Sequence, residues 1–246
     1  MRRLRLMAAT AVAGLLIGIP QTQATLLIAG KIGVTTFSCV DNDPACDVQF
    51  LTTGTLQLAN QTINGVQING SIQTSTGTPA NPGMNTLNAS SLSLINTTTS
   101  SRTIAFTVGD TDFAGPIDKF FTSGSGTWQT ANGSTITLNW YNDPNNDQGA
   151  ETTTDTPGNL IDTFTDVANG PADSFAHNGS GPISDLGKFS MTLQATGTLV
   201  AGGQLINRGQ TEIKTPVPEP TSLALLGAAL AGLGAIAGRS RRRKAA

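Results

Sequence analysis

The chain has 246 residues, with 12% charged and 5% aromatic side chains and a formal net charge of −2 at pH 7. The charge is unevenly distributed, because eight of the fourteen cations lie near the two termini and residues 25–215 carry a net charge of −9. An acidic body argues against nucleic acid and anionic lipid surfaces as partners. About 190 residues remain between the termini, which is enough for one domain with a sizeable core.

The first 24 residues have the three parts of a secretory signal peptide. Three arginines within the first five residues form a positive region, and residues 6–19 form a short apolar run. Small residues then lead to Ala24 at the expected cleavage position. We therefore expect export by the Sec route and removal of the signal peptide after Ala24.

The only two cysteines, Cys39 and Cys46, follow early in the exported part. Outside the cytoplasm such a pair is expected to form a disulfide. Closing a loop of about eight residues stabilises the fold by roughly 2.5 kcal/mol in the chain-entropy model. The predicted bridge would pin the turn between the two cysteines.

The body is rich in Thr, Ser, Asn and Gly, a composition that favours strands and tight turns over helices. Apolar and polar residues alternate in residues 103–108, 135–140 and 189–199, which predicts half-buried strands. Short strands with frequent turn signals predict an all-β body, an antiparallel β-sandwich or jelly roll. The residues expected to point inward are Ile104, Phe106, Val108, Ile136, Leu138, Trp140, Phe189, Met191, Leu193, Ala195 and Leu199.

Three dipeptides predict turns between neighbouring strands. Asn64-Gly65 and Asn132-Gly133 each stand between β-type segments and are typical of type I′ hairpins, because Asn-Gly tolerates positive φ at both central positions. Gly202-Gly203 predicts a third turn, which would pair residues 191–200 with residues 205–213.

Aromatic residues in the middle of the chain have two possible roles. Trp128, Trp140 and Tyr141 could form a platform on which sugar rings stack, since aromatic faces suit sugars. With so few aromatic residues in the chain, packing between strands is the favoured interpretation.

A candidate calcium loop follows. Asp143, Asn145 and Asp147 place oxygen-bearing side chains at alternate positions, a spacing that can wrap calcium. The match to an EF-hand-type loop is partial, because Gln148 stands where that loop needs glycine and Thr154 stands where it needs a bidentate glutamate. A calcium site and a solvated acidic loop both remain open.

Three segments rich in Pro, Gly, Asn or Asp are expected to be long loops: residues 77–84, 141–159 and 168–184. The sole histidine, His177, lies in the third. A single histidine excludes a zinc site with several His ligands, and sequence neighbours alone do not make a Ser-His-Asp triad. We expect a loop histidine and no catalytic residue.

The last thirty residues have three parts in a fixed order. Pro218-Glu219-Pro220 comes first, an uncharged stretch follows, and five cations lie near the terminus. The eighteen uncharged residues make a helix of about 27 Å at ~1.5 Å per residue, close to the ~30 Å of a bilayer core. The positive end should stay in the cytoplasm. The expected divisions are a signal peptide (1–24), a β-rich exported domain (25–210), a linker (211–220), a transmembrane helix (221–238) and a cytoplasmic basic tail (239–246).

This tail resembles the PEP-CTERM signal of bacterial exported proteins, in which a membrane-embedded exosortase recognises the Pro-Glu-Pro region and removes the tail. The resemblance implies that Pro218, Glu219 and Pro220 are recognition residues. It also implies a precursor anchored in the inner membrane and a product at the cell surface or outside the cell. It covers only about an eighth of the chain.

We therefore expect a non-catalytic surface or matrix protein with a structural or adhesion role. Proteins with this tail are commonly tied to extracellular polysaccharide and biofilm, so the resemblance makes polysaccharide the expected partner. One alternative is a carbohydrate- or calcium-binding module, and a further one is a hydrolase in which His177 or two carboxylates meet in a concave site. No cofactor other than calcium is expected.

Overall fold

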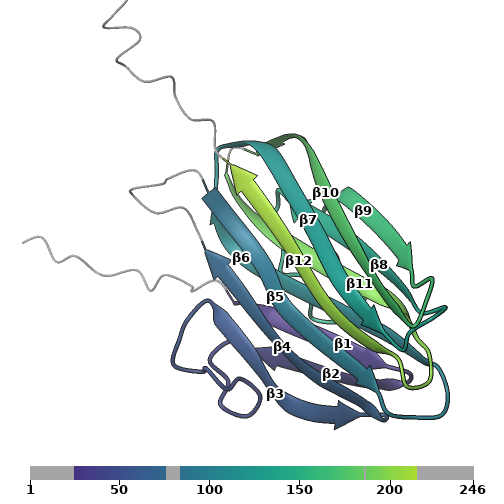
Figure 1. Ribbon diagram of the computed structural model, residues 1–246. Helices are drawn as coiled ribbons and strands as arrows, with labels where there is room; N and C mark the ends of the chain where they lie inside the picture. The colour runs from purple at the N-terminus through teal and green to yellow at the C-terminus, as the bar shows by residue number, and fades with distance from the viewer. Residues whose placement is uncertain (1–24, 76–83, 186, 215–246) are drawn as a thin grey trace, which may run out of the picture.

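The computed structural model describes residues 25–75, 84–185 and 187–214, which form twelve strands and no helix (Figure 1). The predicted signal peptide with Ala24, the Pro-Glu-Pro motif and the apolar span lie outside the described residues. Among the described residues, no helix is long and apolar enough to cross a membrane.

The strands form two six-stranded antiparallel sheets that pack face to face, which confirms the predicted β-sandwich. Sheet A is ordered β2 (Thr35–Val40), β1 (Leu27–Ile32), β6 (Arg102–Ala114), β11 (Lys188–Leu199), β8 (Thr135–Asp143) and β9 (Asn159–Val167). Sheet B is ordered β10 (Ala172–Asp185), β7 (Ile117–Gln129), β12 (Gln204–Lys214), β5 (Met84–Asn96), β4 (Val66–Ser75) and β3 (Thr55–Ile63).

The core lies between the two sheets. All eleven residues predicted to point inward from β6, β8 and β11 are buried, as the period of two requires. Thr107 and Thr192 lie on the outer face of sheet A, where alternation predicts exposure, yet both are also buried. The reason is that residues 144–158 fold over this face, and the Thr107 hydroxyl donates a hydrogen bond of 2.9 Å to the Thr153 carbonyl.

Only one of the three predicted turns joins neighbouring strands of one sheet. Asn64-Gly65 connects β3 to β4 with φ values of 49° and 76°, which confirms this hairpin. The hairpin predictions at Asn132-Gly133 and Gly202-Gly203 are wrong, because β7 and β12 lie in sheet B whereas β8 and β11 lie in sheet A. Turn residues set the local backbone but do not decide whether the chain returns beside the same strand or crosses to the facing sheet.

The prediction of a loop over residues 168–184 is also wrong, since Ala172–Asp185 is strand β10. β10 forms an edge of sheet B and hydrogen-bonds only to β7. An edge strand tolerates Pro182 and several glycines, because one side of its backbone has no ladder partner. β12 continues to Lys214, so it also takes the first four residues of the predicted linker.

β12 ends at Lys214, at one end of the sandwich. We call this end the tail end. The ends of β4 and β6 and the start of β3 lie here, on the left in Figure 1. Residues 41–54, which we call the disulfide loop, connect β2 to β3 at the same end. The Asn64-Gly65 turn and the β1–β2 turn at Val34 lie at the opposite end, where Asn64 Nδ2 donates to the Ile32 carbonyl at 2.8 Å.

Candidate functional site

The disulfide loop begins with the predicted bridge. Cys39 and Cys46 form a disulfide, which confirms the sequence prediction, and Cys39 is part of the buried core. The bridge holds a tight turn in which the Asp47 N–H donates to the Asp43 carbonyl at 2.8 Å. It therefore fastens the loop to the edge of sheet A.

Removing this bridge should lower stability measurably. The double variant Cys39→Ala/Cys46→Ala is expected to lose about 2–3 kcal/mol of unfolding free energy, because the unfolded chain regains the entropy of an open loop. Urea unfolding of the purified protein measures the loss, and reduction of the wild type should give a similar value. A loss below about 0.5 kcal/mol would contradict this entropic account.

Two buried carboxylates organise the loop, and Asp47 also ties it to sheet B. The Asp47 carboxylate accepts hydrogen bonds from the backbone N–H groups of Gln49 and Gln57, both at 2.9 Å. Asp41 accepts the Gly54 N–H at 2.7 Å. Burial raises the pKa of Asp41, and the neighbouring Asp47 carboxylate adds to this effect. Both oxygens of Asp47 and Oδ2 of Asp41 are thus occupied in folding the loop, whereas Oδ1 of Asp41 is buried without a hydrogen-bond partner among the described residues.

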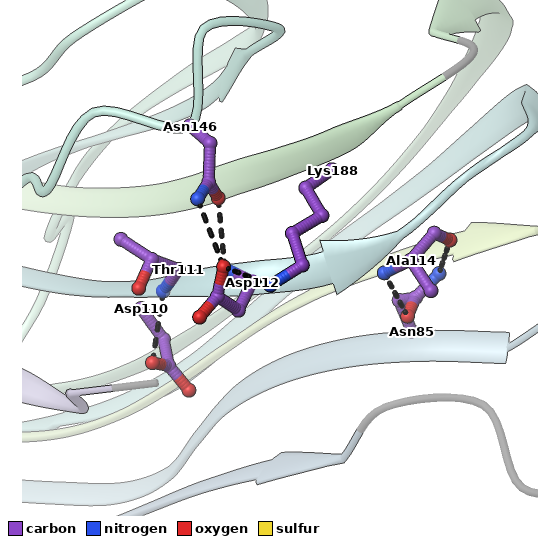
Figure 2. A network of polar contacts seen from close by, with 7 residues as sticks. All are labelled: Asn85, Asp110, Thr111, Asp112, Ala114, Asn146 and Lys188. Atoms are coloured by element: carbon purple, nitrogen blue, oxygen red, sulfur yellow. Dashed lines mark hydrogen bonds and ion pairs between the residues drawn. The ribbon is translucent and has the colours of Figure 1, made fainter. Parts of the chain in front are cut away.

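Asp110 is a third buried carboxylate at the tail end, shown in Figure 2. Its side chain accepts the Thr111 N–H at 2.8 Å. Burial raises the pKa of Asp110 to about 6, and the negative charges of Asp41 and Asp112 contribute in the same direction. The hydrogen bonds from Thr111 and Thr74 oppose the shift without cancelling it.

A polar network beside Asp110 fixes the long loop over residues 144–158 (Figure 2). Asn146 accepts the Asp112 N–H at 2.7 Å and donates to the Asp112 carboxylate at 3.0 Å. Lys188 contacts the same carboxylate at 2.8 Å. Across the sandwich, Asn85 of sheet B donates to the Ala114 carbonyl of sheet A at 2.9 Å. These contacts tie loop and sheets together at the tail end.

The candidate calcium residues lie at the start of this loop. Asp143 is buried, and its two oxygens accept the N–H groups of Asn145 and Asp147 at 3.2 and 2.8 Å. Its carboxylate therefore closes a turn, while the side chains of Asn145 and Asp147 are exposed. In the part of the chain that the structure describes, no three acidic, His or Cys side chains are grouped to hold a metal ion. Calcium at this loop stays a prediction.

His177 lies on strand β10 rather than in a loop. Its Nε2 is 2.8 Å from Asp162 Oδ2, and the Thr122 hydroxyl hydrogen-bonds to the same oxygen. The imidazole stacks on Phe164 at 4.8 Å between ring centroids, and it is 5.5 Å from Trp140. Asp162 belongs to β9 of sheet A, so the cluster joins the edge strands of the two sheets.

The order of groups in this cluster differs from a catalytic triad. In a triad the imidazole lies between the carboxylate and the hydroxyl, so that it takes the proton from the nucleophile. Here the carboxylate of Asp162 lies between Thr122 and His177. The cluster therefore does not have the arrangement of a Ser-His-Asp triad, and its contacts join the edges of the two sheets.

The three aromatic candidates do not share a surface. Trp128 and Trp140 are completely buried between the sheets, and Trp128 Nε1 donates to the Asp166 carboxylate at 2.8 Å. Tyr141 is half-buried and follows Trp140 on the same strand, so it points to the opposite face of sheet A. The two indoles belong to the core and present no face to a sugar.

The outer face of sheet B carries two adjoining hollows of about 350 and 420 Å³ over β3, β4 and β5. A bulge in β3 leaves Ala59 and Asn60 opposite Asn69, and both asparagines line both hollows. None of the lining residues is charged. We call this surface the amide face; its polar members are Gln57, Asn60, Gln61, Thr62, Gln67, Asn69, Ser71, Ser91 and Ser93. Val48 of the disulfide loop borders the larger hollow.

A third hollow of about 280 Å³ lies over β7, β10 and β12 of the same sheet. Its lining includes the half-buried ring of Phe121, with Gln210, Glu212 and Asn178 around it. The Lys119 ammonium lies 5.4 Å from the centre of this ring. The sequence prediction missed Phe121, although its spacing from Ser123 and Ser125 could have placed it on the polar face of a strand.

The fold and these surfaces define an all-β protein with polar outer faces and a sorting signal beyond its last strand. Residues 216–244 match the model of the PEP-CTERM protein-sorting motif, as the resemblance of the tail predicted. This motif implies an exported protein, a precursor that passes the membrane, and processing by an exosortase.

No curated protein matches the chain. Among solved structures the chain is similar to TmCBM61 in complex with β-1,4-galactotriose, with 12% identity, a TM-score of 0.28, and coverage of 61% of this chain and 89% of that one. It is also similar to the C-terminal CBM6 of LamC from Zobellia galactanivorans, with 9% identity, a TM-score of 0.23, and coverage of 64% and 98%. The tailspike protein 4 of bacteriophage CBA120 shows 14% identity and a TM-score of 0.29, with coverage of 68% and 20%. These likenesses are too distant to bear on function.

Proposed function

We propose that the mature protein is a non-catalytic adhesion or structural component of the cell surface or extracellular matrix, and that it holds extracellular polysaccharide on its amide face. The observation that carries this proposal is the pair of uncharged, polar hollows on the outer face of sheet B. The sorting motif supports delivery outside the cell.

The chemistry of the amide face suits a neutral, hydroxyl-rich polymer. Each Asn or Gln side chain both donates and accepts hydrogen bonds, as each sugar hydroxyl does. A single exchange of water for sugar yields little net free energy, so affinity has to come from many contacts along an extended chain. Two adjoining hollows over three strands offer such a row, and the hollow beside Phe121 extends it across the sheet.

Binding to the cell's own matrix polysaccharide tests this function. The variant Asn60→Ala/Asn69→Ala is expected to weaken retention on neutral matrix polysaccharide by about thirtyfold, because each of the two lost hydrogen bonds contributes about 1 kcal/mol. Affinity electrophoresis of the mature protein in gels that contain the polysaccharide measures the change.

The matched control is Thr137→Ala/Thr165→Ala, which removes a hydroxyl pair 2.9 Å apart on the outer face of sheet A. This control should be retained like the wild type. Equal retention of both variants, or no retention of the wild type on any fraction of the matrix, would argue against the proposed function.

A further inference from the structure

The disulfide loop exposes apolar side chains at its tip. Of the seven large hydrophobic residues exposed in the described part of the chain, three lie in four consecutive positions: Val48 at 55%, Phe50 at 39% and Leu51 at 86%. We call these three residues the apolar tip. The tip is held in a defined position, because the Val48 N–H donates to the Gln57 carbonyl and the Thr52 N–H donates to the Gln49 carbonyl, both at 2.8 Å.

The apolar tip lies at the end of the sandwich from which the sorting tail leaves. Gly54, just after the tip, accepts the Thr74 N–H at 2.9 Å. Thr74 pairs with Leu87 on the neighbouring strand β5, and Leu87 pairs in turn with Thr211 on β12. Thr211 lies three residues before Lys214. Three strand spacings of about 4.8 Å separate β3 from β12, and the three residues from Thr211 to Lys214 add about 10 Å along the strand. The start of β3 therefore lies about 18 Å from the exit of the tail.

The chain outside the structure limits how far this end can be from the membrane. Six residues separate Lys214 from Thr221, the first residue of the uncharged span. The seven Cα–Cα steps reach at most about 25 Å when fully extended. In an anchored precursor the end of β12 must therefore lie within about 25 Å of the bilayer.

We propose that the apolar tip rests on the periplasmic surface of the membrane while the precursor is anchored. This inference rests on the proposed function, because sorting through an anchored precursor supplies the tether. Membrane contact removes the tip from water.

The charge of the loop identifies the kind of lipid. Residues 41–54 contain three aspartates and no Lys or Arg, so anionic head groups would repel the loop. Uncharged, zwitterionic lipid is the matching surface, and apolar contact is the attraction. Such contact is weak alone, but the tether raises the local concentration of the membrane surface. Cleavage of the tail removes the tether, so the body is then released.

Fluorescence of single tryptophan substitutions tests this orientation. The full chain carrying Leu51→Trp is reconstituted into phosphatidylcholine vesicles with and without brominated acyl chains. Its added emission should be shifted to the blue and quenched at least twofold by the brominated lipid. The matched control is Val34→Trp, since Val34 is 89% exposed at the opposite end. Its emission should stay unquenched. Subtracting the wild-type spectrum removes the emission of the two buried native tryptophans.

Flotation of the same vesicles separates the two proposals. If the chain does not float with the vesicles, the tether is absent and both the sorting anchor and this inference are wrong. If it floats and Leu51→Trp is no more quenched than Val34→Trp, only this inference is overturned. Shielding of Leu51→Trp that requires added exosortase and is absent in protein-free vesicles would also overturn it, because the tip would then meet protein and not lipid.

Discussion

Replacing Asp110 with asparagine is expected to raise the free energy of unfolding at pH 8 by about 2 kcal/mol and to leave it nearly unchanged at pH 4. In the folded protein the pKa of Asp110 is raised to about 6, above the ordinary value of 3.8, chiefly because the group is buried. The fold therefore favours the protonated form. Below about pH 4 Asp110 is protonated in both the folded and the unfolded state, so its burial costs nothing. Between about pH 4 and pH 6 the unfolded chain ionises while the folded protein keeps the proton, so the protein loses stability in this window, and the full loss persists above pH 6.

The asparagine variant keeps an oxygen that can accept the Thr111 N–H, but it carries no charge at any pH. Urea unfolding at pH 4, 6 and 8 measures the effect as a gain that grows with pH. The matched control is Asp173→Asn, because the N–H groups of Asn169 and Ser174 lower the pKa of Asp173. This control should bring no gain at pH 8. A change in Asp110→Asn that is equal at all three pH values would refute the electrostatic explanation.

Asp110 also connects the stability of the fold to its orientation. It is buried at the tail end beside the buried Asp41 and the half-buried Asp112, close to the start of the disulfide loop. If the apolar tip contacts the membrane, these carboxylates lie at the end of the sandwich nearest to the bilayer. The amide face adjoins the tip, since Val48 also lines one of its hollows, and its other residues lie along β3, β4 and β5.

The period of two was sufficient to predict β6, β8 and β11 and the core residues that they carry. Ile136, Leu138 and Trp140 are buried because alternate residues of one strand point to one face, which is a local property of the chain. The Asn64-Gly65 hairpin was equally predictable, since its positive φ values follow from the residues themselves. These predictions needed no knowledge of neighbouring strands.

Features that depend on distant partners were not predictable. β10 escaped prediction because its Gly-rich sequence becomes a strand only beside β7, where Phe175 packs over Gly126. His177 was likewise placed in a loop, and its contact with Asp162 exists only because the edges of two sheets meet. Thr107 is buried by a loop that lies 46 residues further along the chain. The amide face was missed for the same reason, since its residues come from three strands.

Changing Glu219 to alanine is expected to keep the body attached to the membrane. In the family that the tail resembles, the exosortase recognises the Pro-Glu-Pro region, and residues 216–244 match the motif. Intact mass spectrometry of protein from the cell envelope and the medium gives the result. The wild type should appear in processed form without its tail, whereas Glu219→Ala should remain in the envelope at the mass of the chain with its tail.

The matched control is Glu212→Gln, which removes the nearest carboxylate on the last strand and leaves the motif intact. It should be processed like the wild type, because recognition depends on the motif and not on a general loss of charge. Release of Glu219→Ala at the wild-type rate would show that the exosortase does not recognise this glutamate. Retention of the wild type itself, with its tail, would show that the tail is a permanent anchor, and the body would then bind its polymer at the membrane surface.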